Sequence, residues 1–142
     1  MNALLNDLAP NKCVTNIDTA YQLFEAHDAD LHAHNLTNWQ QQYDQISAGK
    51  FYGSITELGF EGLQVFKEHT SQAVRQSCVI PSDSIWLGFS LDAHQSVRID
   101  GKSVLADEVM CKVAGQHFEL VTPEEFDIYG LVVNKSVLEK SA

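Results

Sequence analysis

The stretch Ser84-Ile-Trp-Leu-Gly-Phe-Ser-Leu91 alternates large apolar side chains with other residues at a period of two. The alternating apolar residues are Ile85, Leu87, Phe89 and Leu91. Successive side chains of a β-strand point to opposite faces, so this pattern predicts a strand over 84–91. We expect the face that carries Ile85 and Leu91 to look into the core, which leaves Trp86 on the opposite face.

Short runs of the same kind continue along the chain on both sides of this strand. They cover 51–58, 62–70, 108–113, 116–121 and 126–133, and Ala114-Gly115 is expected to turn 108–113 back onto 116–121. Asp100-Gly101 separates 96–99 from 102–105 and predicts a two-residue hairpin, because both central positions of such a turn favour positive φ. Seven or eight short strands with close turns predict a mainly β domain, an antiparallel sandwich or barrel with its core at about 51–133.

The residues ahead of this β region have a different period. Leu36, Trp39, Tyr43 and Ile46 are spaced as residues on one face of a helix, which predicts a helical segment over about 28–47. Gly49 suits the left-handed position that follows a helix end.

Size and composition indicate one acidic domain. A chain of 142 residues with 44% hydrophobic residues can bury one core, so we expect a single domain over 1–142. No apolar run is long enough to span a membrane and the first residues lack secretion-signal features, so we expect a cytoplasmic protein. The 19 acidic residues outnumber nine scattered basic ones, which argues against DNA binding by this chain alone.

Motifs of catalysis are absent from the sequence. It has no Gly-x-Ser-x-Gly elbow, phosphate loop, dinucleotide fingerprint or His-Glu-x-x-His helix, so we expect neither an enzyme nor a cofactor. Cys13, Cys78 and Cys111 are too far apart for a disulfide framework or a zinc pair. His32 and His34 are two residues apart and would point in different directions on a helix, so we interpret 27–34 as a solvated helix start rather than a metal site.

Several side chains are candidates for a binding pocket or a packing surface. His69 lies either at a pocket mouth or at a solvent-facing strand end, and Phe89, Cys111 and Tyr129 form either a pocket wall or ordinary core. Trp86, opposite the apolar face of its strand, needs a cover. We expect that cover from the segment with Trp39 and Tyr43 or from a partner chain.

Two stretches resemble the amino-terminal sensing domain of AraC/XylS-type bacterial transcription regulators, in particular the branch that includes ethanolamine-operon regulators. The matching residues are Trp39, Tyr43, Gln45, Ser47, Gly49, Phe51 and Gly53 in the first stretch, and Leu63, Gln64, Phe66, Gln72, Ala73 and Gln76 in the second. Ile46, Ser71 and Val74 depart from the pattern. The resemblance spans about 28–133.

This resemblance implies a cupin-like β-sandwich with one or two short N-terminal helices that binds a small effector and often forms a homodimer. It also implies a C-terminal helix-turn-helix domain beyond residue 142, so 134–142 would begin a linker and DNA would be contacted only through the missing domain. A small cupin-type metalloenzyme and a stand-alone binding module are the alternatives. The effector itself cannot be read from the matched residues.

Overall fold

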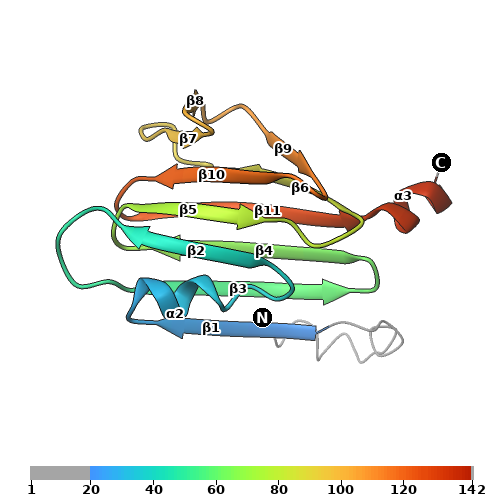
Figure 1. Ribbon diagram of the computed structural model, residues 1–142, viewed down its shortest axis with the longest axis horizontal. Coiled ribbons are helices and arrows are strands. Elements are labelled where there is room, and N and C mark those ends of the chain that lie inside the picture. Colours follow the sequence, from blue (N-terminus) through green and yellow to red (C-terminus); the bar gives the residue numbers. More distant parts are fainter. Residues whose placement is uncertain (1–19, 142) are drawn as a thin grey trace, which may run out of the picture.

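The computed structural model describes residues 20–141, which form two antiparallel β-sheets and two short helices (Figure 1). Sheet A has six strands in the order β1 (Ala20–Ala26), β3 (Gly53–Phe60), β4 (Leu63–Thr70), β11 (Phe126–Asn134), β6 (Ser84–Phe89) and β9 (Met110–Val113). Sheet B has five, in the order β2 (Gln40–Gln45), β5 (Val74–Val79), β10 (His117–Thr122), β7 (Val97–Ile99) and β8 (Lys102–Val104). The helices are α2 (Ala29–Ala33) and α3 (Lys135–Ser141). The predicted mainly β, two-sheet antiparallel class is confirmed.

Most strands of strong period two lie where the sequence predicts them. These are β3, β4, β6 and β11, and the β7–β8 hairpin turns at Asp100 and Gly101 with φ values of 49° and 83°. The expected pairing across Ala114-Gly115 is wrong. β9 pairs with β6 in sheet A and β10 pairs with β5 and β7 in sheet B, so this turn carries the chain from one sheet to the other.

The helix predicted over 28–47 is helical only at α2. Asp28 caps its start by accepting a hydrogen bond from the Leu31 N–H (3.2 Å), and the helix ends at Ala33. Asn38 then takes a positive φ of 70°, and 40–45 pairs with β5 as an edge strand of sheet B. Residues 134–142, expected to begin a linker, include helix α3, which projects from the end of β11 (Figure 1).

The inner and outer faces of β6 are the reverse of the prediction. Trp86 and Gly88 face the core, whereas Ile85, Leu87 and Phe89 are half-buried on the outer face. Gly88 makes room for Trp86 on the inner face, because any Cβ at position 88 would overlap the indole ring. That ring can therefore lie over the glycine and stack on Phe118 from sheet B, with ring centroids 5.0 Å apart.

The core lies between the two sheets and is dominated by rings. Trp39 packs edge-on against Phe66, Trp86 and Phe118 at centroid distances of 5.9 to 6.4 Å. Edge-to-face and stacked rings at these distances are favourable beyond their burial. Within 20–141 no helix is long and apolar enough to cross a membrane.

Candidate functional site

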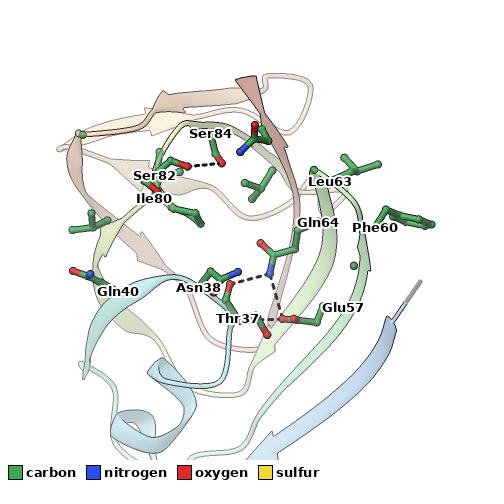
Figure 2. A pocket seen from close by; sticks show the side chains of 17 residues that line it. Thr37, Asn38, Gln40, Glu57, Phe60, Leu63, Gln64, Ile80, Ser82 and Ser84 are labelled. Carbon is green, nitrogen blue, oxygen red and sulfur yellow. Dashed lines mark hydrogen bonds between the residues drawn. The ribbon is translucent and has the colours of Figure 1, made fainter. Parts of the chain in front are cut away.

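An open pocket of ≈ 730 Å³ lies at one end of the sandwich (Figure 2). The β3–β4 turn, the loop from β5 to β6 and residues 37–40 meet around it. Its polar lining residues are Thr37, Asn38, Gln40, Glu57, Gln64, Ser82, Ser84 and Asn134. We call it the end pocket. Its volume is within the range of about 300–1,000 Å³ that is typical of small-molecule sites.

Among the described residues, Glu57 is the only ionisable side chain in the lining of the end pocket. The alternation of β3 turns it inward, so that only 5% of the residue is exposed. Its Oε2 accepts hydrogen bonds from the Thr37 N–H (3.2 Å) and from Gln64 Nε2 (3.5 Å). Within residues 20–141 no basic side chain forms an ion pair with it. The carboxylate is therefore stabilised by neutral donors alone.

Gln64 connects Glu57 to the segment that precedes β2. Its Oε1 accepts a hydrogen bond from Trp39 Nε1 (3.1 Å), and its Nε2 donates to the Thr37 carbonyl (3.1 Å) as well as to Glu57 (Figure 2). Two side chains on neighbouring strands of sheet A thus hold Thr37 and Trp39 in place.

A second polar cluster is buried deeper between the sheets, around Glu68 of β4. Its Oε2 accepts a hydrogen bond from the Tyr43 hydroxyl (2.6 Å) and lies 2.8 Å from Nε2 of His32. Burial, followed by the charge of Glu68, raises the pKa of Tyr43 well above its usual value, and the same two causes raise the pKa of Cys78. The phenol and the thiol therefore stay protonated at neutral pH and act as hydrogen-bond donors.

His32 and His34, two of the three histidines of the 27–34 stretch, lie in different environments. His32 is fully buried against Glu68, which corrects the expectation of a solvated segment, whereas His34 is exposed and lies 2.7 Å from the Asp30 carbonyl. In the described part of the chain no three His, Cys, Asp or Glu side chains are grouped closely enough to hold a metal ion.

The four residues proposed for an effector pocket all lie on the outer face of sheet A, and none lines the end pocket. Phe89 and Tyr129 are cross-strand neighbours with stacked rings, 5.5 Å between centroids. His69 Nδ1 lies 2.7 Å from the Asp127 carboxylate, and Cys111 is exposed on β9. The structure therefore brings together one pair of the four.

The three residues proposed for packing lie inside the sandwich. Trp86 is 2% exposed and is covered by Trp39 and Phe118, so the cover comes from within the chain. Tyr43 packs apart from them, against His32 at a centroid distance of 5.6 Å.

The outer face of sheet A carries two continuous rows of apolar side chains in register across the strands. One row is Tyr21, Leu58, Val65, Leu131, Leu87 and Cys111, and the other is Phe60, Leu63, Val133, Ile85 and Val113. The outer face of an antiparallel sheet is commonly polar. These rows are therefore a second candidate functional surface, for contact with another protein surface.

Sequence reasoning did not find Glu57, Glu68 or Gln64 as site residues. The signal that could have found Glu57 and Glu68 is their place on β3 and β4, where each is two residues from a buried apolar residue, Ile55 or Phe66. A charged residue in phase with core positions indicates a buried, hydrogen-bonded carboxylate.

No family model matches the chain. Among solved structures, the chain is similar to a protein from Shewanella frigidimarina NCIMB 400 described as an RmlC-like cupin. The match has a TM-score of 0.45 and 14% sequence identity, and it covers 66% of this chain and 84% of that chain. The likeness concerns the fold.

Proposed function

We propose that this chain is the effector-sensing domain of an AraC-type transcription regulator and that its effector binds in the end pocket. The observation that carries the proposal is the buried carboxylate of Glu57, in a pocket of ligand size and without a basic partner among the described residues. Trp39 and Gln64, two residues that carry the family resemblance, form the hydrogen-bonded wall beside it. The net charge of −10 favours a separate, basic DNA reader.

The lining of the pocket selects the chemistry of its ligand. A buried carboxylate is stabilised most by a positive charge or by strong hydrogen-bond donors. Both hydrogen bonds that residues 20–141 donate to Glu57 end on Oε2, so among these residues none donates to Oε1. We therefore propose a small ligand with a protonated amine at one end. The neutral amides and hydroxyls of the lining suit binding rather than catalysis.

A thermal-shift comparison of three probes tests this proposal. Aminobutanol with its amine and hydroxyl at opposite ends, pentylamine and butanediol have the same number of non-hydrogen atoms but differ in charge and in acceptor groups. We expect the two amines to raise the melting temperature more than the neutral diol, because only the amines bring a positive charge to Glu57. A ligand at 100 times its Kd adds about 2.7 kcal/mol to the free energy of unfolding.

The matched variants are Glu57→Gln and Glu61→Gln. Glu57→Gln keeps the shape and removes the charge, so the preference for amines should disappear. Glu61→Gln removes an exposed charge from the nearby β3–β4 turn and should leave the preference intact. A wild-type protein that responds to none of the probes, or to the diol as strongly as to the amines, contradicts the proposal.

We also propose that a second copy of the chain packs on the outer face of sheet A. The two apolar rows support this, because monomeric proteins rarely leave apolar patches of such extent in water. The face becomes polar at one end, where Glu25 and Asp127 lie, and Lys67 is the one charged side chain of the described strands between that end and the apolar rows. Two copies of an acidic chain repel each other least where they meet through an uncharged surface such as these rows.

Sedimentation at micromolar concentration tests the proposed homodimer. Leu131→Glu in the middle of one row, and Val113→Glu, which is 39% exposed and therefore less able to disturb the fold, should each convert the dimer to a monomer. Ser103→Glu on β8 is the control and should leave the dimer intact. A wild-type monomer at high micromolar concentration would show that something else covers this face.

A further inference from the structure

A smaller cavity lies behind the end pocket, in the core between the two sheets. Its volume is ≈ 10 Å³, enough for one atom the size of a water oxygen. Rings and aliphatic side chains form most of its wall. The polar residues in the wall are Gln41, Glu68, Gln76 and Cys78. We call it the inner cavity.

Two wall residues of the inner cavity carry buried N–H groups without an acceptor. Gln76 Nε2 and Trp86 Nε1 have no hydrogen-bond partner in the described part of the chain, and each residue is 2% exposed. Two of the acceptors in the same wall are already in use. Glu68 Oε2 accepts from the Tyr43 hydroxyl (2.6 Å), and Gln41 Oε1 accepts from Cys78 (3.3 Å). Buried donors of this kind are costly to leave unpaired, so the group that is missing is an acceptor.

Four consecutive residues, 36–39, separate the inner cavity from the end pocket. Thr37 and Asn38 line the end pocket, whereas Leu36 and Trp39 line the inner cavity. Asn38 has a φ of 70°, a left-handed value that a residue other than glycine adopts at a cost. This partition, residues 36–39, has no regular secondary structure.

The side chains that fix the partition are the same ones that face a ligand in the end pocket. Glu57 accepts from the Thr37 N–H (3.2 Å), and Gln64 bonds both the Thr37 carbonyl and Trp39 Nε1, each at 3.1 Å. A ligand amine bound to Glu57 shares this carboxylate with the Thr37 N–H and with Gln64. Binding in the end pocket is therefore linked to the position of Trp39.

We infer that the inner cavity is a deep subsite for the hydrogen-bond acceptor end of the ligand, reached when residues 36–39 move aside. The inference rests on the proposed function of the end pocket. The ligand class is then a small molecule with an amine at one end, held by Glu57, and a hydroxyl, ether or carbonyl oxygen at the other. That oxygen accepts from Gln76 Nε2 and Trp86 Nε1.

The same three probes test the inference, read by binding and by tryptophan fluorescence. Trp39 and Trp86 are the only two tryptophans of the sequence, and their rings lie 5.9 Å apart, so movement of Trp39 changes the emission. Aminobutanol should bind roughly 3- to 10-fold more tightly than pentylamine, because only aminobutanol carries an acceptor for the inner donors.

Gln76→Leu removes one of the two inner donors and should remove most of the difference between aminobutanol and pentylamine. Thr122→Val is the matched control. It removes another buried, unpartnered polar atom, Oγ1 of Thr122, which lines neither cavity, and it should leave the difference intact. If Gln76→Leu does not fold, the affinities of aminobutanol and pentylamine for the wild-type protein still test the deep subsite.

Each outcome has one meaning. Amines that bind equally well without a change in emission overturn the deep subsite, leave the proposed function in place and make the inner cavity the site of an internal water only. Probes that do not bind at all overturn the proposed function, and the subsite with it. A preference for aminobutanol that Gln76→Leu removes and Thr122→Val keeps supports the subsite.

Discussion

At the scale of single residues, the interior of this sandwich depends on hydrogen bonds to two buried carboxylates. Glu68 has two donors from outside its own strand, Tyr43 at 2.6 Å and His32 at 2.8 Å. A buried carboxylate that loses a donor keeps its desolvation cost, so each donor contributes more than a surface hydrogen bond does.

Tyr43→Phe is therefore expected to lower the free energy of unfolding by about 1.5–3 kcal/mol. The comparison is with Tyr52→Phe, which removes a hydroxyl hydrogen bond of the same length, 2.6 Å, to the exposed carboxylate of Glu25. That loss should be much smaller, because water replaces the partner. Urea unfolding of both variants measures the difference, and equal losses would contradict the burial of the Glu68 cluster.

Gly88→Ala tests the inward position of Trp86. The added methyl group would overlap the indole ring, so we expect a loss of about 1–3 kcal/mol and a change in the near-ultraviolet circular dichroism of the tryptophans. Ser103→Ala on the exposed hairpin strand β8 is the control and should change neither. If Trp86 faced outward, Gly88→Ala would have little effect on either measurement.

At the scale of elements, Asp100 connects three strands of the two sheets. From the turn of the β7–β8 hairpin its carboxylate lies 2.7 Å from Lys112 Nζ on β9 and accepts from the Glu119 N–H of β10 (2.9 Å). Lys112 first, and then the Glu119 N–H, holds the pKa of Asp100 below its usual value. The ionised form is thus favoured by folding.

This lowered pKa predicts the sign of a pH effect. A carboxyl whose pKa is lower in the folded state stabilises the fold above its unfolded pKa, about 3.9, and loses that contribution as pH falls through the folded value. The stability difference between wild type and Asp100→Asn should be constant above about pH 5 and should shrink below it. Asparagine tolerates the positive φ of 49°, so the variant isolates the charge. Asp107→Asn, at an exposed position, serves as the control. If the stability difference between wild type and Asp100→Asn did not depend on pH, the bonds of Asp100 to Lys112 and to the Glu119 N–H would not contribute as described.

Strands with a clear period of two could be predicted from the sequence, and the other strands could not. β3, β4, β6, β11 and the hairpin could be predicted because their alternation or their turn residues are clear. β2 could not be predicted, because its sequence Gln-Gln-Gln-Tyr-Asp-Gln has only one apolar side chain, which an edge strand tolerates. In addition, Leu36, Trp39 and Tyr43 have the spacing of one helix face although they do not lie on a helix. β1 was also missed.

The candidate site was harder to predict than the fold. Sheet A is apolar on both faces, so alternation identifies its strands but does not tell inside from outside. His69, Phe89, Cys111 and Tyr129, proposed from the sequence for an effector pocket, lie on the outer face of sheet A. The end pocket is lined instead by polar residues from four separate segments. Only the register of β3 against β4 and the path of 36–39 bring Glu57, Gln64 and Thr37 together.

At the scale of the whole molecule, the proposed ligand site and the proposed dimer surface lie on different parts of the sandwich. Its end holds a pocket with one carboxylate, and the two apolar rows of sheet A offer an uncharged surface on a chain of net charge −10. β3 and β4 contribute both to the end pocket and to the apolar rows. A ligand that shifts residues 36–39 against these strands could therefore alter how two copies pair, with a coupling free energy of the usual size, about 1–3 kcal/mol.

The most direct test of the account is a titration of ¹⁵N-labelled protein with aminobutanol, followed by NMR. We expect saturable shifts centred on the amides of Thr37, Asn38 and Gln64, and their loss in Glu57→Gln. Shifts confined to the outer face of sheet A, or unchanged shifts in Glu57→Gln, would contradict the claim that this end of the sandwich is the ligand site.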